Sequence, residues 1–241
     1  MQLNEGRPMD VGAILDSAFS IYRRNFVALV GAVAVIVVPL ALLELVMGQI
    51  AFLPSILIGL LPSAVGARVV ADVIRGERPT VAGIWNELTP NVVALIVTGI
   101  LVVLTILVGL VLIIVPGIIF GVWFSLTAPV IAIESRRYTA AMGRSRDLVR
   151  GSWWRVFGIL LLVGVLTAVA SFVVTAPFDG GSGGLASSTS GTIAGAVANL
   201  IVAPFSALAT ALLYFDLRLR REGTDLARSI DELGPLPPPV A

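Results

Sequence analysis

The chain has 241 residues, of which 57% are hydrophobic and 13% are charged, and its formal net charge is +1. That charged fraction is about half of what a soluble domain carries, and a soluble core could not bury this much apolar side chain, so lipid must solvate much of it. The chain has no cysteine and no histidine, which excludes disulfides, thiolate metal sites and the commonest general base.

The apolar runs predict an all-α, polytopic integral membrane protein. A transmembrane helix needs about 20 predominantly apolar residues. Six runs meet this length, and the second is the weakest because Pro54 and Pro62 interrupt it. The six predicted spans are residues 27–47, 50–71, 91–113, 115–133, 156–177 and 193–215.

A short amphipathic segment precedes each pair of predicted spans. Helical spacing of apolar residues follows Asp10, which suits a helix N-cap, and it returns after Thr80. A third, more basic segment comes before the fifth span. We therefore expect interfacial helices near residues 10–25, 80–89 and 139–154, and three repeats of an interfacial helix plus a helical hairpin.

The same patterns give the domain organisation. Residues 1–217 are predicted to form one membrane domain, and residues 218–241 a cytoplasmic tail. Within the tail, Leu226, Ile230 and Leu233 suggest a short amphipathic helix, which Gly234 and Pro235 would stop. The proline-rich end beyond them should be extended and disordered.

The arginines set the expected orientation. They occur in the N-terminal segment, in the second and fourth connections and in the tail, whereas the other three connections have none. Because basic residues collect on the cytoplasmic side, both termini are expected there. All sixteen basic residues are arginine, which suggests a GC-rich bacterial genome. We therefore expect a multi-pass protein of the bacterial inner membrane.

Charged residues near the span ends are the candidate functional groups. Glu134 and Asp216 are expected to form a structural charge network that orients helix ends, together with Arg155 and Arg218. Arg68 and Asp72, four residues apart, should form a local ion pair. Seven arginines could contact anionic lipid headgroups. They are Arg144, Arg146, Arg150, Arg155, Arg218, Arg220 and Arg221.

Several short strings resemble one bacterial membrane family. They include Arg7-Pro8, Tyr22-Arg23-Arg24-Asn25-Phe26, Pro116-Gly117-Ile118, Trp154-Arg155 and, most specifically, Tyr214-Phe215-Asp216-Leu217-Arg218. Together they are similar to the glycerophosphoryl diester phosphodiesterase membrane-domain family. In some of its members this membrane module is fused to a catalytic barrel that needs histidines and metal-binding carboxylates. This chain has no histidine and no room for a barrel, so the resemblance implies the module without the activity.

These observations favour a non-enzymatic membrane module, a scaffold or lipid-interacting partner in envelope or lipid metabolism. The sequence predicts no catalytic, cofactor-binding or metal-binding residue. The expected partners are membrane lipids and a membrane or cytoplasmic protein, with no nucleic acid. A transporter or permease subunit is the alternative, because internal repeats and proline-broken helices are transporter features. An intramembrane enzyme is disfavoured because acids at membrane depth are scarce.

Overall fold

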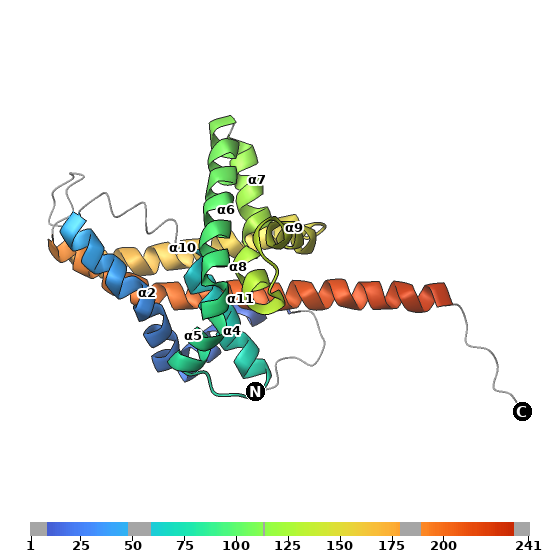
Figure 1. Cartoon of the computed structure of the whole chain (residues 1–241), viewed down its shortest axis with the longest axis horizontal. Helices are drawn as coiled ribbons and strands as arrows, with labels where there is room; N and C mark the ends of the chain where they lie inside the picture. Colours follow the sequence, from blue (N-terminus) through green and yellow to red (C-terminus); the bar gives the residue numbers. More distant parts are fainter. Residues whose placement is uncertain (1–8, 48–58, 113, 179–188, 234–241) are drawn as a thin grey trace, which may run out of the picture.

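A computed structural model describes residues 9–47, 59–112, 114–178 and 189–233, and every regular element within them is helical (Figure 1). The α-helices are α1 (Val11–Arg24), α2 (Phe26–Met47), α4 (Leu60–Ile74), α5 (Val81–Leu88), α6 (Val92–Leu112), α7 (Ile114–Phe124), α8 (Thr127–Glu134), α9 (Tyr138–Val149), α10 (Trp153–Thr175) and α11 (Thr189–Leu233). Two short 3-10 helices, η2 (Thr89–Asn91) and η3 (Ala176–Phe178), extend α5 and α10.

Five helical stretches of the described residues are long and apolar enough to cross a membrane. They are Phe26–Val46, Val81–Val111, Ile114–Glu134, Trp153–Phe178 and Ser190–Gly223, with mean hydropathies between 2.0 and 3.0. The prediction of an all-α membrane protein is confirmed. The second predicted span is not among the five. Its described part is α4, which has 15 residues, and residues 48–58 lie outside the described ranges.

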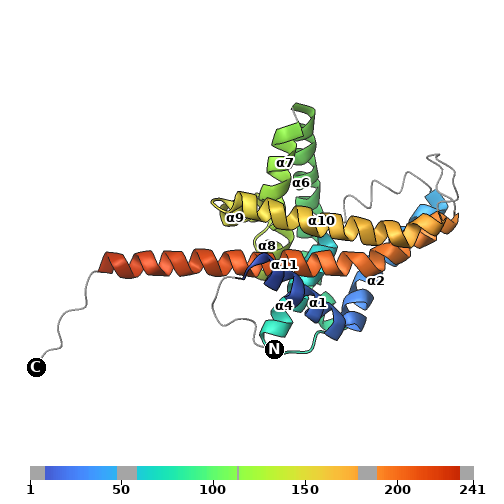
Figure 2. The same cartoon turned by 180° about the vertical axis from the view of Figure 1, so that it is seen from behind.

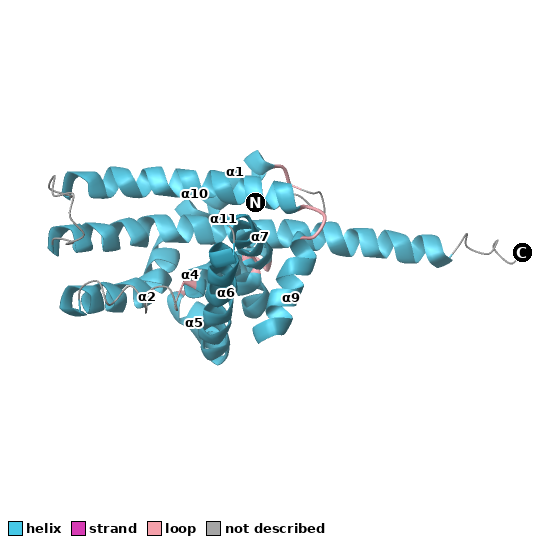
Figure 3. Cartoon of the chain, turned by 90° about the horizontal axis from the view of Figure 1, so that it is seen from above, coloured by secondary structure: helices cyan, strands magenta, loops and turns pink. Residues whose placement is uncertain are grey.

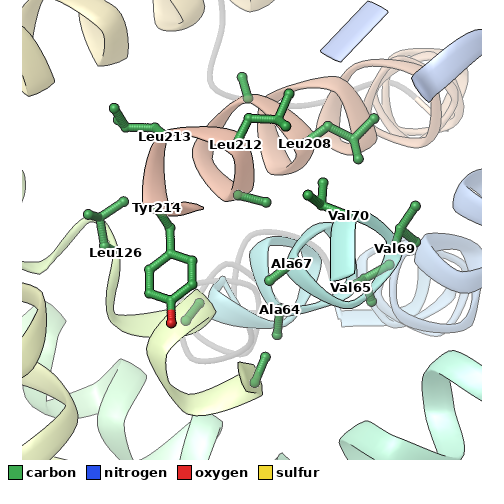
Figure 4. Close-up of a cluster of buried hydrophobic side chains, with 14 of the residues drawn as sticks. Ala64, Val65, Ala67, Val69, Val70, Leu126, Leu208, Leu212, Leu213 and Tyr214 are labelled. Carbon is green, nitrogen blue, oxygen red and sulfur yellow. The ribbon is translucent and has the colours of Figure 1, made fainter. Parts of the chain in front are cut away.

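Helix α4 lies at the centre of the molecule. Every residue from Ala64 to Asp72 is buried, so this helix is enclosed on all sides rather than on one face. Its most extensive partner is α11, and α8 covers another side. Figure 4 shows α4 beside α11, with Val70 of α4 close to Leu208 of α11 within one cluster of buried side chains. The core of the protein is therefore built around the helix of the span that was predicted to be the weakest.

Helix α11 is the longest element and touches helices from each third of the chain. It packs against α1, α2, α4 and α10, and Figure 3 shows α2 and α10 running along its two sides. The hairpin of α6 and α7 stands across this layer, and α1 lies against α11 on the side shown in Figure 2. The chain thus forms a layer of long helices joined to a crossing hairpin.

Short helices form near all three predicted positions, as α1, α5 and α9. The Asp10 carboxylate accepts a hydrogen bond of 2.7 Å from the Ala13 amide, and the Thr80 hydroxyl accepts one of 3.1 Å from Gly83, so both residues cap their helices. In α1, however, Ile14 has no exposed surface because it packs inside the protein. In chain order a short helix precedes a pair of longer helical segments three times: α1, α5 and α9 each open one unit.

Some predicted boundaries are wrong. The third short segment was expected to run to residue 154, but α9 ends at Val149 because Gly151 adopts a left-handed φ of 89°, and α10 begins at Trp153. The bounds of the predicted span 115–133 agree with the candidate span Ile114–Glu134, but the helix is interrupted between α7 and α8. Pro129 has no amide to donate to the Ser125 carbonyl four residues earlier, and its ring crowds that turn.

The last helix differs from the predicted domain division. Helix α11 continues without a break across residue 217 to Leu233, so the predicted tail helix is part of it. The proline-rich end lies outside the described residues. Part of the predicted outer loop from Phe178 to Gly191 also lies outside them. The described residues of this segment belong to η3 and α11.

The crossing of α4 and α11 depends on Gly66. A Cβ at this position would lie 2.6 Å from the carbonyl carbon of Ala207, too close for backbone to tolerate. We predict that Gly66→Ala lowers the free energy of unfolding by about 1–3 kcal/mol, as overpacking does. Gly121→Ala is the matched control, since its Cβ would meet no atom within 4 Å. Thermal unfolding in detergent, followed by size exclusion, measures both. Equal stability of the two variants would contradict this crossing.

Candidate functional site

The Asp216 carboxylate is the centre of the first charged cluster. It lies on α11 with 1% of its side chain exposed, and it accepts hydrogen bonds from Arg155 at 2.8 Å, from Arg220 at 2.9 Å and from the Met9 amide at 2.7 Å. Both arginines also donate to the Met9 carbonyl. One buried acid therefore ties the chain before α1 to the start of α10 and to α11.

Glu134 is the centre of the second cluster. This residue ends α8, and its carboxylate accepts a hydrogen bond of 3.0 Å from Arg144 of α9 and another of 3.0 Å from the Tyr214 hydroxyl of α11. Arg136, just after α8, lies 3.1 Å from the same carboxylate. The side chain of Glu134 is 10% exposed, so its charge is compensated by partners from three places in the fold.

Helix α11 joins the two clusters. Tyr214 and Arg218 are four residues apart, as are Asp216 and Arg220, so each pair lies on one side of the helix. Arg218 donates to Glu222 at 2.7 Å, and Glu222 also lies 3.7 Å from Arg144, which holds Glu134. The structure therefore places both predicted network carboxylates in ion pairs. A structural role for the network stays a prediction.

Most of the arginines that were expected at lipid headgroups make contacts inside the protein. Those that pair with carboxylates or donate to backbone carbonyls are Arg144, Arg155, Arg218, Arg220 and Arg221. The Arg146 guanidinium lies 4.6 Å from the ring centroid of Trp123, and this side of α9 is exposed. Arg150 is also exposed. Arg146 and Arg150 are therefore the members of this set best placed to meet a headgroup.

The expected ion pair between Arg68 and Asp72 is replaced by pairs with other partners. Arg68 is 8% exposed, and its guanidinium pairs with Glu87 of α5 and approaches the Ala132 carbonyl of α8. Asp72 pairs with Arg75 at 3.5 Å. Because α4 is enclosed, Arg68 meets neighbouring helices that the sequence alone does not place beside it, whereas Asp72 pairs with the residue that caps its own helix.

Two polar groups outside the predicted set hold the site together. The Ser145 hydroxyl of α9 donates to the Trp123 carbonyl at 2.7 Å and accepts from the Leu126 amide at 3.2 Å, which satisfies backbone groups freed at the break between α7 and α8. The other group is the Met9 backbone, which bonds to Asp216, Arg155 and Arg220. No sequence pattern predicts either contact, because a serine or a backbone group can be assigned a partner only once the fold is known.

Tyr22 of α1 stabilises the proline-containing part of α11. Its hydroxyl donates to the Ile201 carbonyl at 2.9 Å, in the turn before Pro204, where the proline ring weakens the helical hydrogen bonds. Burial raises the pKa of the Tyr22 hydroxyl above its ordinary value of 10.0. This contact is a second connection between the first and last helices.

The geometry of the two clusters suits electrostatic stabilisation. Both central carboxylates are saturated by arginine, tyrosine or amide donors, and no group of three or more metal-ligating side chains occurs among the described residues. No protein-family model matches the chain, and neither a curated protein nor a solved structure shows detectable similarity to it. Fold and site together define an all-α, polytopic membrane protein whose helix ends are joined by a buried charge network.

Replacing Asp216 tests how much this network contributes to the stability of the fold. We predict that Asp216→Asn lowers the free energy of unfolding by about 3–5 kcal/mol, because it leaves two arginines facing an uncharged, buried partner. Glu222→Gln on the same helix is the control, since the Glu222 side chain is 52% exposed. It should cost about 1 kcal/mol or less. Detergent-solubilised unfolding curves give both values, and a small effect of Asp216→Asn would show that the cluster is dispensable.

Proposed function

We propose that this protein is a non-enzymatic membrane module that works as a scaffold or lipid-interacting partner in envelope or lipid metabolism. The observation that carries the proposal is the imbalance of charge around the two clusters. Residues 134–155 and 214–223 contain nine arginines and four acids. The two buried acids each accept hydrogen bonds from several donors, so few of their lone pairs are left to contact a substrate or a metal ion.

Excess arginine at the ends of membrane helices suits an anionic surface. Each basic residue near an anionic leaflet contributes about 1 kcal/mol of attraction, which fades within a Debye length. Trp154 lies in the first turn of α10 with 77% of its surface exposed, which suits a side chain at the headgroup level. These features support attraction of anionic lipid to the face formed by α9 and the start of α10.

The cellular setting belongs to the same proposal. The arginine-bearing connections support an orientation with both termini in the cytoplasm, and the absence of lysine supports a bacterial inner membrane. The resemblance of Tyr214-Phe215-Asp216-Leu217-Arg218 supports membership in the glycerophosphoryl diester phosphodiesterase membrane-domain family. In this structure Tyr214 and Asp216 of that string hold the two charged clusters together.

Orientation can be tested with single cysteines, because the chain has none of its own. We predict that Ser187→Cys, between the last two spans, reacts with a membrane-impermeant maleimide in intact cells. Ser229→Cys, beyond the last span, should react only after permeabilisation. The native cysteine-free chain is the control for background labelling. The reverse pattern would overturn the proposed orientation.

Attraction of anionic lipid predicts enrichment around the protein. We expect particles cut from the membrane with styrene–maleic acid to contain more phosphatidylglycerol, relative to phosphatidylethanolamine, than the bulk membrane. Arg146→Gln with Arg150→Gln should move this ratio toward the bulk value, since about 1 kcal/mol of attraction is lost per charge. Lipid mass spectrometry measures the ratio. Asp147→Asn, on the same helix, is the control and should not lower it.

Two outcomes would count against the proposed function. A wild-type lipid ratio equal to that of the bulk membrane would exclude selective attraction. Steady turnover of glycerophosphodiesters by the purified protein, abolished by Glu134→Gln, would show that the buried carboxylate is catalytic. Turnover could also be lost because Glu134→Gln, which removes the carboxylate that Tyr214 contacts, unfolds the protein. A thermal unfolding curve distinguishes the two causes, since an unfolded variant has no thermal transition.

A further inference from the structure

A groove separate from the two charged clusters lies between two corners of the chain. One wall is the junction of α1 and α2, residues 21–28, and the other is the connection from α4 to α5, residues 73–81. Its volume is about 980 Å³, which is large enough for a small organic group. Nothing in the charge network described above occupies it.

The groove is lined by arginines that lack the carboxylate partners seen elsewhere. Arg23, Arg24 and Arg78 all line it and are exposed, and within the described residues none of them makes an ion pair. Glu77 also lines the groove, but its carboxylate lies 3.8 Å from Arg75. The balance of charge in the groove is therefore positive, in contrast to the clusters at Asp216 and Glu134.

Both walls of the groove are held in place by helix ends. Helix α4 ends in a Schellman motif, in which Gly76 has a φ of 78° and the Glu77 amide donates to the Asp72 carbonyl at 2.9 Å. On the opposite wall, Asn25 caps the C-terminal end of α1, and its side-chain amide donates to the Ile21 carbonyl at 3.1 Å. Arg24 and Arg78 thus extend from backbone that is fixed before any ligand binds.

The groove also has an apolar wall at the start of a membrane span. The first candidate span begins at Phe26, directly after the two arginines of α1. Val27 and Ile74 line the groove with exposed fractions of 82% and 50%. Guanidinium groups beside apolar surface, at the depth where a span begins, match the chemistry of a phospholipid, whose phosphate adjoins acyl chains.

We propose that this groove binds the headgroup of one anionic phospholipid, with its phosphate held by Arg23, Arg24 and Arg78. The proposal rests on the lipid-interacting function above and assigns it a defined site. The planar guanidinium can bind two phosphate oxygens at once, which a lysine ammonium cannot do. The upper part of the acyl chains would lie along Val27 and Ile74. Such a lipid is held at one site, unlike the loosely enriched lipid near Arg146 and Arg150.

Native mass spectrometry of the full chain, exchanged into a mild detergent with added phosphatidylglycerol, tests the site. The wild type should retain one phosphatidylglycerol per chain. Arg24→Lys with Arg78→Lys preserves charge and topology but should reduce retention about tenfold, because the bidentate contacts are lost. Arg146→Lys with Arg150→Lys is the matched control and should retain the lipid. Equal retention by the groove variant and the wild type would overturn the proposal.

Inorganic phosphate separates a lipid site from a simple anion site. Because the apolar wall contributes, phosphatidylglycerol should raise the thermal transition of the wild type, whereas millimolar phosphate should not. An equal rise with phosphate alone would show that the groove binds a free anion, and the lipid assignment would be wrong. If the wild type retains no phosphatidylglycerol in detergent but its membrane particles are still enriched in that lipid, the groove proposal is wrong and the proposed function stands. If the wild type shows neither retention nor enrichment, both proposals are wrong.

Discussion

The close crossing of α4 and α11 is the constraint on which the rest of the structure depends. Gly66 lets the backbone of α4 approach Ala207 so closely that no side chain fits between them. With α11 on one side and α8 on another, α4 is enclosed from Ala64 to Asp72. A helix enclosed in this way orders its neighbours, because each of them packs on a rigid partner instead of on fluid lipid.

The charged layer follows from that enclosure. Since α4 is buried, Arg68 is largely removed from water, and its guanidinium pairs with Glu87 of α5. Since α11 covers α4, its polar side carries Tyr214 to the end of α8 and Asp216 to the start of α10. The same helix therefore presents an apolar surface to the core and an ionic surface to the helix ends, and the two surfaces fix its rotation.

The charge network and the groove divide the arginines into two classes. Arginines of the network pair with buried carboxylates. Replacing one partner leaves an uncompensated charge and lowers the stability of the fold. Arg23, Arg24 and Arg78 carry the same group without such partners and lie beside apolar surface at the start of a span. Burial and pairing, more than residue type, separate a structural arginine from one that can bind an anionic ligand.

The sequence by itself determined the membrane class, the helical fold and the short capped helices, because hydropathy and capping are local properties that adjacent residues express. It also singled out Glu134 and Asp216 as charges at helix ends. Only the tertiary structure decided that α4 is the core, that Arg68 pairs with Glu87, and that Ser145 and Met9 complete the site. These contacts join residues far apart in the chain, and no local pattern encodes which distant group a buried polar atom will meet.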